Sequence, residues 1–147
     1  MKFHRILLLI ACILLIYPTD SAAQQKKQLP SSVTGELIKA AEKSDAKSQF
    51  ELGETYYREF NYDEAVKWYR KAADQGYSDA QNVLAKAYAA GEGVTQDFNE
   101  AVKWHRKAAD QGNVDSQSIL GWMYDNGFHI TTDYAEAAKW YRKAADQ

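Results

Sequence analysis

An all-α solenoid is the fold class that this sequence predicts, on three observations. The segment around Trp68 recurs around Trp104 and Trp140, and a period of 36 residues is typical of stacked supersecondary units. Both prolines, Pro18 and Pro30, precede the repeats, so proline interrupts no helix there. Apolar and small residues within each unit also recur at helical spacing. We therefore expect a right-handed superhelix of helix-turn-helix repeats.

Each repeat is predicted to contain two helices. We expect the repeats at about 44–76, 77–112 and 113–147, after a half-repeat at 33–43. The first helices are predicted at about 46–58, 79–90 and 115–126, and the second helices at about 62–75, 98–111 and 134–146. Asn61, Asp97 and Asp133 each stand three residues before a glutamate, a pattern typical of a helix N-cap. Gly76 and Gly112 stand where a left-handed C-cap is expected.

The first 23 residues have the pattern of a secretory signal peptide. Two basic residues precede twelve apolar ones (6–17), and small residues follow, so we expect cleavage after Ala23. Twelve residues rise about 18 Å as a helix, less than a hydrocarbon core of about 30 Å, so a membrane-spanning anchor is the weaker interpretation. No membrane span is expected after cleavage. The pattern predicts a periplasmic or secreted bacterial protein. Lipid anchoring through Cys12 is the minor alternative, and residues 24–32 are predicted to be a linker.

Composition excludes several classes of function. The chain has 18 basic and 20 acidic residues, a net charge of -2, which gives no counterion-release drive toward nucleic acid. One cysteine and three histidines exclude a disulfide framework, a cysteine-type zinc site and a cysteine nucleophile in the repeats. We expect no metal and no other cofactor. His105, which stands where other repeats have tyrosine, is expected to be a packing residue.

The positions shared by the repeats resemble the Sel1-like repeat family, a relative of the tetratricopeptide repeat. The pattern is Leu-Gly-x-x-Tyr, then Gly-x-Gly-Val and Asp, then Glu-Ala-x-x-Trp-Tyr-x-Lys-Ala-Ala-x-x-Gly, over about 33–147. The first repeat lacks the glycine loop and has tetratricopeptide spacing. Small residues are expected where alanines of the partner helix approach, at Gly53, Ala85 and Gly121.

The resemblance implies that first helices line a concave groove and second helices the convex side. On the convex side, ion pairs at helical spacing are expected in solvent, between Glu64 and Lys67 and between Arg70 and Asp74. Matched to the tetratricopeptide pattern, the inward-facing positions are Phe50, Glu54, Tyr57, Arg58, Asn82, Lys86, Ala89, Ala90, Ser118, Trp122, Asp125 and Asn126. Those that differ between repeats are candidate partner-binding residues, because stacking alone explains the shared ones.

Trp122 is the most informative of these positions. Its counterparts are Glu54 and Lys86, so the repeat needs no aromatic ring there, and we expect an interface anchor. In the third loop His129 replaces a glycine that is predicted to have positive φ. Phe128, His129 and Trp122 are therefore predicted to form one aromatic patch. The alternatives are a Trp122 that folds back into the core and simple drift in the last repeat.

We predict an extracytoplasmic scaffold that binds a protein or peptide in its groove and catalyses nothing. No His-Glu-x-x-His, nucleophile elbow or phosphate-binding glycine loop is present. Two alternatives stay open. One is a hydrolase of cell-wall or β-lactam substrates, of the secreted Sel1-like type, although those relatives look cysteine-rich. The other is a fragment of a longer repeat array.

The last helix is predicted to carry a bare apolar strip. No capping helix follows it in the sequence, so we expect exposed outward sides at Trp140, Tyr141, Ala144 and Ala145. An exposed apolar strip commonly marks an association surface. We therefore expect a weak homodimer through residues 134–146, isologous because the same strip can pair with itself.

Overall fold

The computed structural model describes residues 34–147, and this part of the chain contains seven α-helices and no strand. The helices are α3 (Gly35–Glu42), α4 (Ala46–Arg58), α5 (Tyr62–Asp74), α6 (Ser78–Ala90), α7 (Phe98–Asp110), α8 (Val114–Asn126) and α9 (Tyr134–Ala145). The predicted signal peptide, its cleavage site, Cys12 and the linker lie outside the described residues. The six predicted repeat helices are present with bounds within one residue, and α3 lies within residues 33–43, where a half-repeat was expected.

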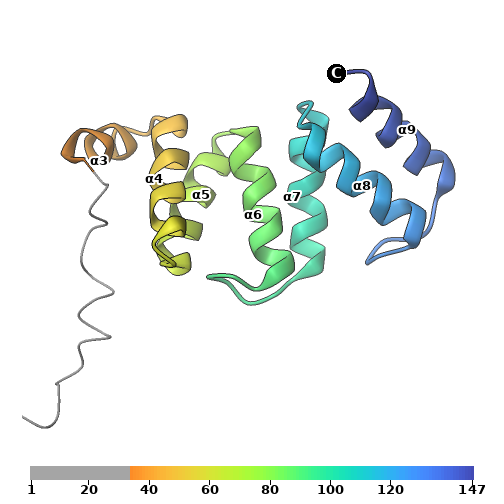
Figure 1. Cartoon of the computed structure of the whole chain (residues 1–147), viewed down its shortest axis with the longest axis horizontal. Coiled ribbons are helices and arrows are strands. Elements are labelled where there is room, and N and C mark those ends of the chain that lie inside the picture. The colour runs from red at the N-terminus through yellow and green to blue at the C-terminus, as the bar shows by residue number, and fades with distance from the viewer. Residues whose placement is uncertain (1–33) are drawn as a thin grey trace, which may run out of the picture.

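The helices follow one another in a row from α3 to α9 (Figure 1). The main contacts join consecutive helices, and they are most extensive within the pairs α4–α5, α6–α7 and α8–α9. These pairs are the three repeats, and α3 packs on α4. The chain is thus a helical repeat solenoid, as its sequence predicts. We call the contact between the first and second repeats the first interface, and that between the second and third repeats the second interface.

Two of the three predicted N-caps form. Asp97 Oδ1 accepts hydrogen bonds from the N–H groups of Asn99 and Glu100, at 2.9 and 3.1 Å, and Asp133 caps α9 in the same way. The prediction is wrong for Asn61, whose side chain makes no cap hydrogen bond. Its backbone, at φ -90° and ψ 68°, lacks the extended conformation of the two aspartates. Each downstream glutamate binds a lysine three residues later, in the pairs Glu64–Lys67, Glu100–Lys103 and Glu136–Lys139.

The small residues of the first helices lie against aromatic rings. A Cβ at Gly53 would lie 2.6 Å from the Tyr69 ring, and one at Gly121 would lie 2.7 Å from the Tyr141 ring. The sequence predicted close approach of alanines; the Ala65 carbonyl oxygen lies 3.3 Å from a Cβ at Gly53, but the tyrosine ring is nearer. The second repeat has Ala85 and His105 at the equivalent positions, both buried. A larger residue on the first helix thus accompanies a smaller ring on the second.

A buried glutamine joins the start of each repeat to the helix before it. The Nε2 groups of Gln49, Gln81 and Gln117 donate, at 2.9–3.1 Å, to the carbonyl oxygens of Ala41, Ala73 and Ala109. Their Oε1 atoms accept, at 2.6–2.9 Å, from the Nε2 groups of Gln75, Gln111 and Gln147. Each buried amide therefore has a donor and an acceptor partner, which removes the penalty of burying it. We call this repeated arrangement the glutamine ladder.

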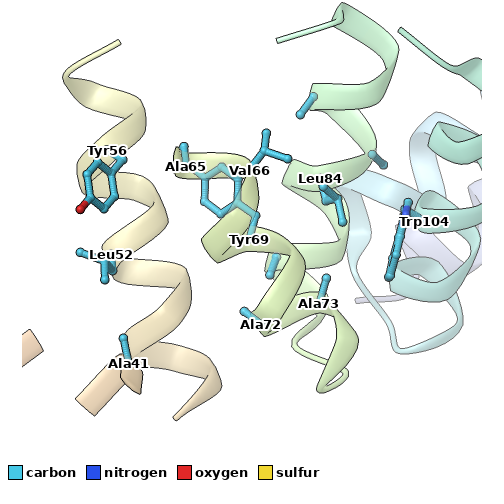
Figure 2. Packing of buried hydrophobic residues seen from close by; sticks show 13 residues of the cluster. Ala41, Leu52, Tyr56, Ala65, Val66, Tyr69, Ala72, Ala73, Leu84 and Trp104 are labelled. Atoms are coloured by element: carbon cyan, nitrogen blue, oxygen red, sulfur yellow. The ribbon is translucent and has the colours of Figure 1, made fainter. Parts of the chain in front are cut away.

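The core runs through the row as two apolar clusters. Figure 2 shows the first, in which Leu52, Tyr69, Leu84 and Trp104 come from four successive helices. Trp104 is 5% exposed, as expected of a packing residue. The expectation that Trp140 is bare is wrong, because Trp140 packs in the second cluster. The rest of the predicted strip on α9 is open: Tyr141 is 40% exposed, Ala145 is exposed and Ala144 is half-buried.

The cationic side chains of the second helices pair with aromatic rings. Lys71, Lys107 and Lys143 lie 3.7–4.0 Å from the ring centroids of Trp68, Trp104 and Trp140. Arg70 donates to the Tyr88 hydroxyl rather than pairing with Asp74 as expected, because the next helix brings that hydroxyl within reach. Arg106 donates to Tyr124 in the same way. The predicted pair of Glu64 with Lys67 is present at 2.5 Å.

Candidate interaction surface

An aromatic cluster lies at the surface of the second interface. Trp122 is 46% exposed, and its ring centroid lies 5.2 Å from that of Phe128. His129 lies 4.4 Å from Phe128 and stacks on Phe98, at 4.0 Å with an interplanar angle of 9°. The patch of Trp122, Phe128 and His129 therefore exists as predicted, and Trp122 is not folded into the core. Sequence reasoning missed Phe98, although it begins a second helix as the aromatic residues Tyr62 and Tyr134 do.

The two long loops share one backbone form. Gly93 has φ +69° and His129 has φ +54°, so the predicted positive φ is present in both. A Cβ at Gly93 would lie 2.3 Å from the carbonyl oxygen of Tyr62, so this loop packs its backbone directly on the start of α5. In the other loop the His129 ring stacks on Phe98, the equivalent of Tyr62. The backbone contact between Gly93 and Tyr62 thus has a side-chain counterpart in the third repeat, the stacking of His129 on Phe98, and the aromatic cluster forms there.

The second interface contains a buried polar network beside its apolar cluster. Ser116 Oγ donates to Asn82 Oδ1 at 3.0 Å, so His105 Nδ1, at 3.1 Å from the same Oγ, is the donor of that second hydrogen bond. The pKa of His105 is lowered to about 4, mainly by burial and also by the Lys86 ammonium, while Asp115 acts in the opposite direction. His105 is therefore neutral and structural. Asn82, predicted to face a groove, is 6% exposed and its amide is used within this network.

The first interface contains a cavity of about 180 Å³. Three predicted groove residues, Glu54, Tyr57 and Lys86, line it, together with Tyr62, Val66, Tyr69, Val83, Ala87 and Glu92. Val66 and Tyr69 lie on α5, between α4 and α6 (Figure 2). Phe50, also predicted to face the groove, is half-buried nearby, with its ring 5.8 Å from Tyr69 and 5.3 Å from Tyr77.

Two carboxylates of this cavity accept hydrogen bonds from phenols. Tyr69 donates to Glu54 Oε1 at 2.6 Å, and Tyr57 donates to Glu92 Oε2 at 3.1 Å. Burial, then the bond to Glu54, raises the pKa of Tyr69, and the bond to Glu92 raises that of Tyr57. Both phenols therefore stay protonated donors at neutral pH. Lys86 forms an ion pair with Asp115 at 3.1 Å, which lowers the pKa of that carboxyl group.

The remaining predicted residues lie mostly at the C-terminal ends of the first helices. Arg58 donates to the carbonyl oxygen of Glu54 and to Thr55 Oγ1, both at 3.3 Å, and Asn126 donates to the carbonyl oxygen of Trp122 at 2.9 Å. Asp125, Ala90 and Ser118 are exposed, and Ala89 is half-buried. The predicted partner-binding residues therefore do not form one site. Some line the cavity, some belong to the aromatic cluster, two lie in the interior, and the others lie elsewhere on the first helices.

Within residues 34–147, no group of three or more His, Cys, Asp or Glu side chains could hold a metal ion. Over the same range, no helix is long and apolar enough to cross a membrane.

Stacked two-helix units and a core of two apolar clusters shared between repeats define the class of protein as an α/α repeat solenoid. The model of the Sel1 repeat matches three successive segments, residues 46–77, 78–113 and 114–147. These cover most of the chain, so the chain belongs to the Sel1 repeat family. Proteins of this family generally mediate protein interactions.

Solved structures of other Sel1 repeat proteins are similar to this chain. A protective antigen of uropathogenic Escherichia coli with an SLR fold is 43% identical at a TM-score of 0.72, over 76% of this chain and 25% of the antigen. A Sel1 repeat protein from Oxalobacter formigenes is 36% identical at a TM-score of 0.67, over 70% of this chain and 44% of its own. Cysteine-rich protein B of Helicobacter pylori, at 23% identity and a TM-score of 0.62, supports the fold alone.

One curated relative also matches, over a short segment. It is a negative regulator of exopolysaccharide production from Rhizobium leguminosarum bv. viciae, 44% identical over 48 residues. The match covers 33% of this chain and 18% of the relative. This chain therefore spans a small part of that relative and less than half of the two more similar solved structures.

Proposed function

We propose that this Sel1 repeat protein is an exported scaffold that binds a protein or peptide partner on the surface formed by its first helices and long loops. The observation that carries the proposal is Trp122, an exposed aromatic residue where the other repeats have Glu54 and Lys86. Stacking does not require this ring, and large half-exposed aromatic side chains are typical anchors of protein interfaces. Phe128 and His129 extend the apolar surface beside it.

A pair of matched baits tests this proposal. The wild-type protein and Trp122→Ala are each immobilised, and bound proteins from the envelope fraction of the source organism are identified by mass spectrometry. We expect a partner that the wild type retains and Trp122→Ala loses by about tenfold or more, because anchor residues carry much of the binding energy. Phe60→Ala is the control, since Phe60 is 79% exposed but lies outside the aromatic cluster. Equal capture by Trp122→Ala and the wild type would contradict the proposal.

Export rests on the sequence pattern of residues 1–23. Mass spectrometry of the mature protein tests it: an N-terminus at Gln24 supports cleavage after Ala23, whereas an intact Met1 or a lipid on Cys12 contradicts it. The alternative of a cell-wall or β-lactam hydrolase predicts turnover of a reporter β-lactam or of labelled peptidoglycan by the pure protein. A scaffold turns over neither.

A further inference from the structure

The cavity of the first interface has the size of a site for one side chain. Its volume of about 180 Å³ is below the about 300 Å³ at which pockets for drug-sized ligands begin. Its lining combines three tyrosines, two glutamates and Lys86, and apolar residues complete its walls. A surface-exposed partner residue could therefore enter it, while a larger ligand could not.

The tyrosines present aromatic surface to this space. The ring centroids of Tyr57 and Tyr62 lie 5.0 Å apart with an interplanar angle of 60°, so the two rings present differently directed surfaces. Tyr69 adds a third ring, held by its hydrogen bond to Glu54. Aromatic faces carry partial negative charge and attract cations. The rings also pack well against the methylene stem of a long side chain.

The charge around the cavity is negative. Glu54 and Glu92 each accept one phenol hydrogen bond through one oxygen, and an ionised carboxylate has further acceptor sites. One cation, Lys86, lines the cavity, and it is paired with Asp115, which lies outside the lining. The two glutamates of the lining therefore outnumber its one lysine. The charge complements an additional positive group.

We propose that this cavity binds the cationic side chain of a lysine or arginine from a partner polypeptide. The stem lies among the tyrosine rings, and the charged head donates to the free oxygens of Glu54 and Glu92. The second interface differs at the equivalent positions, where Trp122 replaces Lys86 and Phe128 replaces Glu92. The carboxylate of Glu92 is therefore specific to the first interface, which supports the assignment of a cationic ligand to this cavity. The inference rests on the proposed function in taking the partner to be a polypeptide.

Titration of short peptides tests the proposal. The probes are capped alanine pentapeptides with a central lysine, arginine, norleucine or glutamate, added to the purified protein while the tyrosine ring resonances are followed by NMR. Assignment uses Tyr57→Phe, Tyr62→Phe and Tyr69→Phe. We expect the lysine and arginine peptides to shift these three rings, with affinity at least about tenfold above that of the norleucine peptide.

Two double variants that each remove two negative charges test whether the preference for cationic peptides arises at the cavity. Glu54→Gln with Glu92→Gln keeps the acceptors for the two phenols but removes both charges, and we expect it to abolish the preference for lysine over norleucine. Glu51→Gln with Glu59→Gln removes two charges from exposed residues that do not line the cavity, and we expect it to keep the preference.

Each other outcome overturns the inference. Norleucine binding as tightly as lysine would make the cavity an apolar site, tighter binding of glutamate would make it an anion site, and no saturable shift would remove it as a site. The proposed function is judged separately by the Trp122→Ala capture. Loss of capture there together with silent peptides would leave the scaffold standing and reject the cationic site alone.

Discussion

The two interfaces of this solenoid have opposite distributions of aromatic and polar side chains. The first has aromatic rings inside, with Phe50 and Tyr77 against Tyr69, and charged residues around a cavity. The second has a polar network inside, joining Asn82, His105 and Ser116, and aromatic rings at the surface. The helix lengths and the glutamine ladder are the same in both. One backbone arrangement can therefore present two different surfaces, and the side chains that differ are those the ladder does not use.

The largest expected effect separates Trp104 of the second repeat from Trp122 of the third repeat. Trp104→Ala should lower the free energy of unfolding by about 3 to 5 kcal/mol, because it empties a buried site. Trp122→Ala should lower it by about 1 kcal/mol or less, because the ring is half-exposed. Urea unfolding of both variants measures the difference. Similar losses of unfolding free energy in the two variants would mean that Trp122 is a core residue, and that the second interface does not present it as a surface residue.

The loop contact of the first interface gives the next effect. Gly93→Ala should destabilise the protein by about 2 to 4 kcal/mol, because the new Cβ meets the backbone of Tyr62 and the residue keeps a positive φ. Gly76→Ala is the matched control, since Gly76 also has positive φ but no neighbour within 4 Å of its Cβ position. It should cost only about 1 kcal/mol. Thermal unfolding that ranks the two equally would mean that the loop relaxes away from α5.

The buried polar network of the second interface predicts that the stability of the protein depends on pH. The pKa of His105 is about 4 in the folded protein and about 6.5 when unfolded, so folding favours the neutral ring. Stability from this source is complete above pH 6.5 and is lost as the pH falls toward 4. Between pH 7.5 and pH 4.5 the loss should be about 2 to 3 kcal/mol. Urea unfolding of wild type and His105→Gln measures it, and the variant should lack this component; equal slopes would exclude His105 as its source.

The pairing of ring size with helix spacing can be tested by exchange. His105→Tyr should destabilise the second repeat by about 2 kcal/mol, because the larger ring meets the Cβ of Ala85. Adding Ala85→Gly recreates the pair seen in Gly53 with Tyr69 and in Gly121 with Tyr141. The double variant should recover about 1 kcal/mol relative to the sum of the single changes. A double-mutant cycle from thermal unfolding measures the coupling, and additive losses would show that the two positions are independent.

The smallest expected effect concerns the face of α9 that corresponds to the faces of α5 and α7 buried in the two interfaces. Ala73 and Ala109 are buried there, whereas Ala145 is exposed and Tyr141 is 40% exposed. We expect weak, concentration-dependent self-association through this face, and Tyr141→Lys should abolish it. Light scattering over a concentration series measures it, with Phe60→Lys as a control that adds the same charge elsewhere. A monomer at every concentration would contradict this expectation.

Features that form within one repeat are predicted from the sequence more fully than contacts between repeats. Helix bounds, the loop conformation at His129 and the patch around Trp122 follow from local spacing, and all are present in the structure. The acceptor of Arg70 and the burial of Asn82 depend on where the next repeat lies, which single-repeat patterns do not define. A usable signal was present for one pair. The small residue at 53, 85 and 121 varies together with the ring at 69, 105 and 141, and this joint variation indicates contact.

The glutamine ladder holds successive repeats at the same spacing, whatever other side chains those repeats carry. Each rung needs only an alanine carbonyl oxygen on one side and another glutamine amide on the other, and all three repeats supply these. Any repeat could therefore follow any other at the same distance, so the rungs allow units to be gained, lost or reordered without a change in geometry. The order of neighbours is instead encoded where the interfaces differ, by Phe50 and Tyr77 on one side and by Asn82 and Ser116 on the other. A chain built in this way can change its surface one repeat at a time while its spacing stays constant.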